Sequence, residues 1–272
     1  MITEKPTIAS SLSNIWACRQ LLMQLWKRDF AARYKTGVLG VAWAVINPLL
    51  MLALYSFVFV SVFKMRWGSG PDVQGNFVIL LFTGLIVHAF FAEFLSRAPL
   101  LISSNPSYVK KVVFPLELLP LMPLLGATIN LGIGVFLVSC LLFYVQGSVP
   151  LTIFLLPLIL APYIVLVVGM SYFLSATGVF VRDMTHVVGL VTTISMFASP
   201  VLFPLENVPE NYRIFLYLNP LTTVVVQLRE VTVLGIIPDL RVWAVYFFIS
   251  MIVFFLGLSW FQATREGFAD VL

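Results

Sequence analysis

The sequence predicts an all-α, polytopic membrane protein with six transmembrane helices, an N-terminal amphipathic interface helix and a re-entrant outer segment before the last span. Composition is the first reason: 60% of the 272 residues are hydrophobic and only 10% are charged, whereas a soluble domain is about half apolar and a quarter charged. The second reason is that long stretches contain no Asp, Glu, Lys or Arg. Soluble, disordered and collagen-like proteins are therefore excluded.

The uncharged stretches have the lengths that membrane helices need. A helix crosses the hydrocarbon layer in about 20 residues, and one run of 64 residues is long enough for two crossings separated by the turn-forming sequence QGSVP at 146–150. The runs are continuously apolar, which favours helices over the alternating strands of a membrane barrel. The five uncharged runs, which give six spans, are 36–63, 73–92, 118–181, 184–205 and 242–264.

An even number of spans places both termini on one side of the membrane. If that side is the cytoplasm, eleven of the sixteen Lys and Arg residues lie inside and five lie outside, as the positive-inside rule requires. The first 35 residues lack the uninterrupted apolar core of a cleavable signal. We therefore expect one transmembrane domain over 1–272, with a cytoplasmic interface helix in 1–35, a membrane region in 36–264 and a cytoplasmic tail in 265–272.

Residues 12–34 are expected to form the interface helix. Apolar side chains recur at spacings of three, four and seven, with basic and polar residues among or opposite them. A basic face combined with tryptophan is typical of helices that lie in the membrane interface, so the helix is either a general anchor on anionic lipid or has a more specific role. The apolar positions are Leu12, Ile15, Trp16, Met23, Trp26, Phe30 and Tyr34.

Charged and ionisable residues within the spans are few. Glu93 and Arg97 lie four residues apart near the cytoplasmic end of the second span, a spacing that predicts an ion pair on the helix surface. A proton relay is disfavoured because no other carboxylate lies deep in a span. His88 is expected to be a hydrogen-bonded packing residue, and with His186 as the only other histidine there is no metal site to propose.

Two short segments between spans carry signals of their own. Asn105 before Pro106 predicts the start of a short cytoplasmic helix that cannot easily continue past Pro115, although an ordinary basic loop would also suit this stretch. On the outer side, the uncharged run 214–228 is too short to cross and is interrupted by Asn219-Pro220. Two short helices that enter the outer leaflet and return are therefore expected, packed against protein or a water-filled cavity.

Several of these segments together resemble the ABC-type polysaccharide-export permeases. The likeness covers roughly residues 15–265, and it is specific as a combination although each piece alone is short. It is carried by RYKTGVLGVAW at 33–43, NPL at 47–49, the stretch 105–115 that ends in VKKVVFP, Arg182-Asp183, SPVLFP at 199–204 and NPL at 219–221.

The resemblance implies a homodimeric permease in the bacterial inner membrane, assembled with two copies of a separate nucleotide-binding ATPase subunit. It further implies export of an undecaprenyl-pyrophosphate-linked polysaccharide, such as O-antigen, capsule or teichoic acid, with no nucleic-acid partner, no cofactor and no metal on this chain. The sequence agrees that the chain is not itself the ATPase, because it contains no Gly-Lys dipeptide and hence no phosphate-binding loop.

Three other interpretations remain open. The first is an exporter of a different lipid-linked or amphipathic substrate. The second is an ion-coupled carrier, which should show paired broken helices in its two halves, whereas the strong break here is in the second half. A membrane enzyme acting on lipid-linked sugars would need clustered carboxylates or histidines at one face, and the outer carboxylates are scattered.

Five groups of residues follow as candidates for function. Arginine offers bidentate geometry to phosphate oxygens, and aromatic faces suit the C–H faces of sugars. The groups are lipid-pyrophosphate recognition by Arg28, Arg33 and Lys35; coupling to the ATPase by Asn105, Tyr108, Lys110, Lys111 and Phe114; the inner turn at Arg182 and Asp183; an outer gate with Pro204, Val208, Arg213, Asn219 and Pro220; and channel aromatics Trp43, Tyr55, Tyr172, Phe173 and Phe180.

Overall fold

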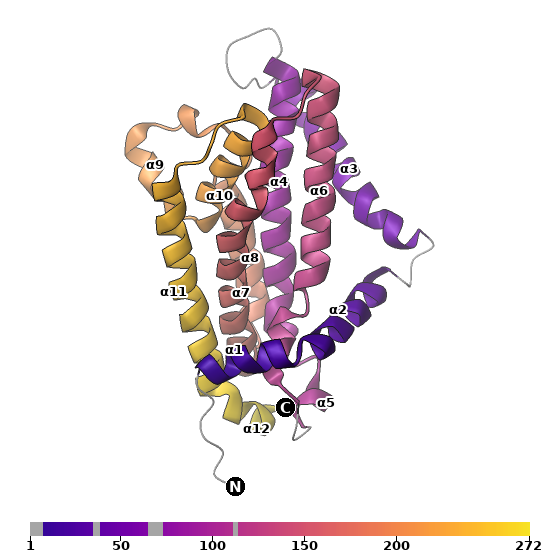
Figure 1. Cartoon of the computed structure of the whole chain (residues 1–272), viewed down its shortest axis with the longest axis vertical. Helices are drawn as coiled ribbons and strands as arrows, with labels where there is room; N and C mark the ends of the chain where they lie inside the picture. The colour runs from indigo at the N-terminus through magenta and orange to yellow at the C-terminus, as the bar shows by residue number, and fades with distance from the viewer. Residues whose placement is uncertain (1–7, 35–38, 65–72, 111–113) are drawn as a thin grey trace.

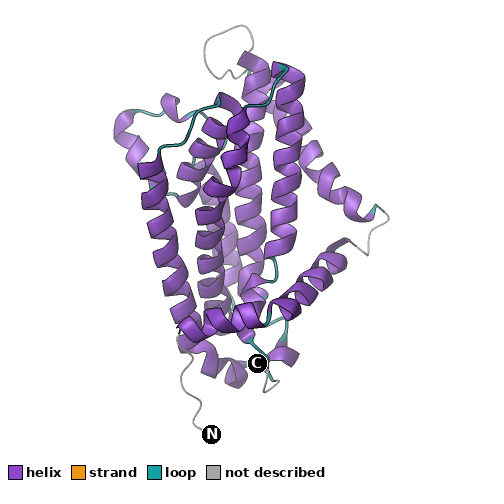
Figure 2. Ribbon diagram, viewed as in Figure 1, coloured by secondary structure: helices purple, strands orange, loops and turns teal. Residues whose placement is uncertain are grey.

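The computed structural model describes residues 8–34, 39–64, 73–110 and 114–272. In these ranges the chain is helical and contains no strand (Figure 2). The long helices run side by side as a bundle, and the first and last helices, α1 and α12, lie at the same end of it (Figure 1). We call this the terminal end and the opposite one the far end.

In the part of the chain that the structure describes, five helices are long and apolar enough to cross a membrane, and a sixth apolar helix is shorter. The prediction of an all-α polytopic membrane protein is therefore confirmed. The first span joins a 3-10 turn at Gly40–Ala42, α3 and a π-helical stretch at Phe57–Val62. The bounds of the six helices are α3 Trp43–Ser56, α4 Val73–Arg97, α6 Leu124–Gln146, α7 Leu156–Phe180, α8 Met184–Phe197 and α11 Leu240–Thr264.

The fifth expected span differs from the prediction in its length. Helix α8 has 14 residues, which at about 1.5 Å per residue is too short to cross the hydrocarbon layer alone. It stops at Phe197 because the chain turns through 198–201, at the Ser199-Pro200 break. The turn expected between the third and fourth spans is present, with Gly147 in the left-handed region at φ 71° ending α6.

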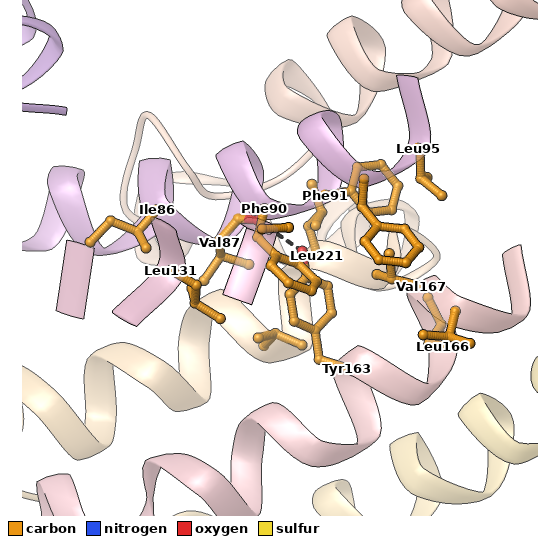
Figure 3. Close-up of a cluster of buried hydrophobic side chains, with 14 of the residues drawn as sticks. Ile86, Val87, Phe90, Phe91, Leu95, Leu131, Tyr163, Leu166, Val167 and Leu221 are labelled. Atoms are coloured by element: carbon orange, nitrogen blue, oxygen red, sulfur yellow. Dashed lines mark hydrogen bonds between the residues drawn. The ribbon is translucent and has the colours of Figure 1, made fainter. Parts of the chain in front are cut away.

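Helix α4 forms the centre of the bundle. Two-thirds of its apolar window is buried, and α6, α7, α8 and α10 (Pro220–Arg229) all pack against it. Figure 3 shows Phe90 and Phe91 of α4 among side chains from α6, α7 and α10. The hydroxyl of Tyr163 on α7 donates to the Val87 carbonyl at 2.8 Å, so that its polar group is paired inside the apolar core.

Helices α7 and α11 touch through their backbones. A Cβ atom added at Gly257 would lie 2.0 Å from the carbonyl oxygen of Gly169. Small residues at membrane helix contacts allow such close approach, which strengthens dispersion contacts where no hydrophobic force acts between helices. These two glycines therefore set the spacing of α7 and α11.

The interface segment is two helices, α1 (Ile8–Ala17) and α2 (Arg19–Tyr34), and not the single helix predicted over 12–34. The helices meet at an angle at Cys18 and lie across the terminal end of the bundle (Figure 1). Leu22 and Leu25 are buried, whereas Trp16 and Met23 are 73% and 44% exposed. Of the predicted apolar positions, Ile15 and Trp26 pack partly buried against the core, whereas Trp16 and Met23 point away from the bundle. The segment therefore carries apolar residues on more than one side, and the bundle covers one of them.

The remaining helices are short. Helix α5 (Pro106–Val109) begins at Pro106, as predicted, and α9 (Glu210–Tyr217) is separated from α10 at Asn219-Pro220, as predicted for the outer segment. α12 spans Phe268–Val271. Short 3-10 or π-helical segments occur at Ala98–Leu100, Leu116–Leu121, Leu151–Leu155, Leu205–Asn207, Glu230–Leu234 and Arg265–Gly267.

Candidate functional site

A cavity of about 440 Å³ lies between α3 and the helices α4, α6 and α8. Its wall is mostly apolar and aromatic, and its polar groups come from three helices. A mainly apolar cavity with a few polar side chains is the usual form of a binding site. Its lining includes Trp43, Asn47, Tyr55, Phe82, His88, Phe90, Glu93, Asn130, Leu131, Gly134 and Met196.

An ionic network contacts this cavity through Glu93. The Glu93 carboxylate pairs with Arg33 of α2 and accepts a hydrogen bond from Asn130 Nδ2 at 2.8 Å. Both terminal nitrogens of Arg97 donate hydrogen bonds to the Asp29 carboxylate, and the one from Nη1 measures 2.9 Å. The predicted pair between Glu93 and Arg97 is therefore wrong, because α2 places an opposite charge against each of them.

Arg33 is enclosed by its partners. Its Nε donates to Asp29 at 3.1 Å while Nη1 pairs with Glu93, and its guanidinium lies against Gly126, where an added Cβ would come within 2.9 Å of Arg33 Cζ. Burial raises the pKa of the Asp29 carboxyl, against the opposing pull of Arg33. Since buried ion pairs add little net stability, we interpret the network as fixing where α2 docks.

The two described residues among those predicted to bind pyrophosphate, Arg28 and Arg33, face different neighbours. Arg33 faces the bundle, Arg28 faces α5, and Lys35 lies outside the described residues. Arg28 Nη1 donates to the Tyr108 hydroxyl at 2.5 Å, and its Cζ lies 5.4 Å from the centre of the Tyr108 ring. The role of these residues in lipid recognition stays a prediction, and the structure adds that two of them hold α2 in place.

The described coupling residues, Asn105, Tyr108, Lys110 and Phe114, lie in and next to α5 at the terminal end. The Tyr108 ring stacks on Phe114 with centroids 4.3 Å apart and planes inclined by 22°. Asn105 Nδ2 donates to the Leu101 carbonyl at 2.9 Å. Lys110 is exposed and Lys111 lies outside the described residues. Helix α5 is thus bonded to α2 on one side and stacked on the chain that follows it on the other.

Glu117 forms a second buried charge contact that the sequence did not indicate. It is 1% exposed and accepts from Arg265 Nη1 at 2.7 Å and from Gln262 Nε2 at 3.2 Å. Its backbone carbonyl accepts from the Tyr172 hydroxyl at 2.9 Å. The segment after α5 is therefore fastened to α7, to the end of α11 and to the turn that follows α11.

The predicted inner turn lies at the terminal end, between α7 and α8. Both Arg182 and Asp183 are exposed. The Asp183 carbonyl accepts from the amides of His186 and Val187 at 3.0 and 3.1 Å, which starts α8. His88 is hydrogen-bonded to the backbone of this helix, as expected for a packing residue: its Nε2 donates to the Thr192 carbonyl oxygen at 3.0 Å.

The five predicted gate residues lie in one outer segment. Arg213 donates to the Val208 carbonyl at 2.9 Å and to the Glu206 carbonyl at 3.2 Å, which closes the loop before α9. The Asn219 side chain caps α10 and donates to Ser195 and Ala198, at 2.8 and 3.0 Å. Pro204 is buried, and the Pro220 carbonyl accepts from Tyr246 at 3.1 Å. Their gating role stays a prediction.

The five predicted channel aromatics do not form one set. Trp43 and Tyr55 line the cavity. Tyr172 is completely buried, so its placement on a channel wall is corrected: its hydroxyl is needed to pair a buried carbonyl. Phe173 lies beside Trp260 of α11 with their rings tilted by 38°, and Phe180 lies near Phe268 of α12. Phe173 and Phe180 are each almost half exposed.

Comparison with known proteins places the chain in a family. The sequence model described as ABC-2 type transporter matches residues 20–233, from α2 through the outer segment. The chain belongs to the ABC-2 type transporter family. The matched region of this ABC-2 type chain contains the cavity, the ionic network, the α5 group and the outer helices.

Named relatives match this ABC-2 type chain over nearly its whole length. An O-antigen export system permease protein RfbA of Klebsiella pneumoniae is 26% identical over 261 residues, which cover 95% of this chain and 97% of the relative. RfbA of Myxococcus xanthus is 26% identical, with 94% and 97% covered. The polysialic acid transport protein KpsM of Escherichia coli is 25% identical, with 89% and 93% covered.

Proposed function

We propose that this chain is the transmembrane subunit of an ATP-driven exporter that moves lipid-linked polysaccharide from the cytoplasmic to the outer face of the bacterial inner membrane. The observation that carries the proposal is the near full-length similarity to relatives named for O-antigen export and polysialic acid transport. The polytopic helical fold agrees with a membrane permease. The terminal end is assigned to the cytoplasm by the excess of basic residues there.

ATP hydrolysis is assigned to a separate subunit, two copies of which bind a homodimer of this chain. The absence of a Gly-Lys dipeptide in the whole sequence supports this division. Helix α5 offers the contact, because it projects at the terminal end with Lys110 exposed and is joined to α2 by Arg28 and Tyr108. A push on α5 would therefore reach α2, and from there α4 through Asp29 and Arg97.

A polysaccharide needs a continuous polar route, since each hydroxyl left unpaired in hydrocarbon costs several kcal/mol. We assign this passage to the homodimer, with weak and repeated contacts along it. The cavity beside α3 supplies suitable groups: Trp43 and Tyr55 present aromatic faces, while Glu93 and Asn130 offer hydrogen-bonding groups at its terminal end.

The lipid carrier is assigned to the junction of α2 and the first span. Arg28, Arg33 and Lys35 supply positive charge where an anionic head group would enter. In this structure Arg33 Nε is paired with Asp29 and Arg33 Nη1 with Glu93. A phosphate group that binds two nitrogens of this guanidinium would therefore have to displace at least one of the two carboxylates. The outer segment with Pro204, Val208, Arg213, Asn219 and Pro220 is assigned as the gate that closes the exit.

The test is complementation combined with energetics. In the bacterium that carries this chain, deletion of its gene should abolish a surface polysaccharide, and the chain purified from the restored strain should bring an ATPase subunit with it. In inverted membrane vesicles, uptake of polymer should depend on ATP and survive an ionophore. Uptake driven by an ion gradient without ATP would establish the ion-coupled carrier instead, and loss of a different lipid-linked product would correct the substrate.

A further inference from the structure

The side chain of Arg229, the last residue of α10, is buried at the far end of the bundle. The residue is 5% exposed, and its guanidinium donates three hydrogen bonds to backbone carbonyls. Nε bonds to Leu80 at 2.9 Å, Nη1 to Pro200 at 2.6 Å and Nη2 to Val201 at 2.9 Å. One side chain thus joins α10 to α4 and to the turn after α8.

The three carbonyl groups that Arg229 binds explain why position 229 is an arginine. Pro200 and Val201 follow the end of α8, where no further helical turn supplies amide donors, and unpaired carbonyls at membrane depth are costly. A guanidinium carries five N–H donors in a planar fork and can reach three carbonyls at once, whereas a lysine ammonium is a single point. The cost of burying the charge is offset by these bonds.

Helix α4 contributes space as well as a carbonyl. A Cβ added at Gly84 would lie 3.0 Å from Arg229 Nη2 and 3.0 Å from the backbone of Val201. Any larger residue at this position would press on the guanidinium and on the turn it holds. Gly84 and Arg229 are therefore two halves of one contact, although 145 positions separate them in the sequence.

The neighbouring outer helix is held differently. Ile214 and Phe215 of α9 are 67% and 64% exposed, and Arg213 bonds to carbonyls of its own loop, those of Val208 and Glu206. Most side chains of α10 are buried in the bundle. The outer segment therefore consists of a fixed helix, α10, and a peripheral helix, α9.

We propose that Arg229 is the positioning residue of the outer segment: by joining α10 to α4 and to the turn after α8, it confines any movement of this segment to α9 and the loop before it. The functional part of the proposal, closure of the exit, rests on the gate assignment made above. The positional part does not depend on transport and can be measured separately.

The experiment compares Arg229→Lys, Arg229→Met and Gly84→Ala in the purified, lipid-embedded protein. Amide hydrogen exchange reports local opening. In the wild type, α9 should exchange faster than α10. In all three variants, the rate of amide exchange in α10 should rise by on the order of tenfold or more. The increase should be larger for Arg229→Met than for Arg229→Lys, and the exchange rate of α6 should not change. Gly84→Ala perturbs the same contact from the α4 side, and it tests the proposal even if the arginine variants fail to assemble.

Two matched variants serve as controls. Arg213→Lys alters an arginine of the same segment that bonds within its own loop, and Gly132→Ala adds a methyl group where nothing lies within 4 Å. Neither should change exchange in α10. If α10 exchange is unchanged in Arg229→Met and Gly84→Ala, the positioning role is overturned.

A measurement of ion leak through vesicles that contain the assembled protein distinguishes the positioning role of Arg229 from the gating role of the outer segment. Faster exchange in α10 with increased leak, at an unchanged melting temperature, supports both assignments. Faster exchange with unchanged leak supports the positioning role and removes the gate assignment from the proposed function.

Discussion

Tyr108 provides the most informative single perturbation, because it links α5 to both of its neighbours. A four-residue helix is too short to be stable by itself. Its order depends on the hydrogen bond from Arg28 and on the ring contacts of Tyr108 with Arg28 and Phe114. Tyr108→Phe removes only the hydroxyl, whereas Tyr108→Ala removes all three contacts.

The structure allows the two losses to be ranked. The hydrogen bond is exposed and screened, so we assign it about 0.5–1 kcal/mol. The cation–π contact adds about 0.5–1 kcal/mol and the stacked pair about 0.5–1.5 kcal/mol. The total for Tyr108→Ala is about 1.5–3.5 kcal/mol if the contacts are independent. Because a partner that binds ordered α5 loses affinity as the ordered fraction falls, the dissociation constant should rise by up to about fivefold for Tyr108→Phe and up to about 300-fold for Tyr108→Ala.

The assay is titration of the permease, held in lipid nanodiscs, with the ATPase subunit that copurifies with it. Arg28→Gln should weaken binding about as much as Tyr108→Phe or somewhat more, since it also removes the charge above the ring. The control is Tyr144→Ala, which truncates an 87% exposed tyrosine at the end of α6 remote from α5. Equal affinity of Tyr108→Ala and Tyr144→Ala would refute the reasoning that α5 is held in its binding position by Tyr108.

Three further predictions concern export, assembly and stability. Arg33→Lys keeps the charge and loses the planar fork, so export and the stimulation of ATPase activity by lipid-linked substrate should fall while insertion and assembly stay intact; wild-type behaviour in both assays would leave only an electrostatic role. Lys110→Glu combined with Lys111→Glu should weaken subunit assembly or uncouple ATP use, measured as ATP hydrolysed per polymer exported, and normal export by the assembled double variant would contradict the docking assignment. Gly257→Ala places a methyl group against the backbone of the facing helix and should destabilise the protein by about 1–3 kcal/mol or more in thermal unfolding, whereas Gly132→Ala, in open space, should be neutral or slightly stabilising.

The sequence predicted those features that depend on a single segment. An apolar run must satisfy its own backbone groups in a bilayer and must be long enough to cross it. The number and order of the apolar helices therefore followed from the uncharged runs. Breaks at 146–150, Ser199-Pro200 and Asn219-Pro220 followed from residues that end helices locally, as did the start of α5 at Pro106.

Partners of charged residues were decided by the tertiary structure. Glu93 and Arg97 have the spacing of a helix-surface pair, yet their partners Arg33 and Asp29 lie 60 and 68 residues away. Arg229 is one of the five basic residues that the charge count placed outside, and its side chain is buried with a hydrogen bond to Leu80, 149 residues away. Such pairs arise because packing brings distant elements together, and the pattern of one helix carries no record of which helix will lie beside it.

The same limit applies to the faces of helices. The spacing of apolar residues showed that the interface segment is helical, but Leu22 and Leu25 are buried while Trp16 and Met23 are exposed. Among the aromatics, Trp43 lines the cavity whereas Tyr172 pairs a buried carbonyl. In a chain that is apolar on almost every side, hydrophobicity determines that a segment enters the membrane. Only the arrangement of its neighbours determines whether a given side chain meets protein, lipid or a cavity.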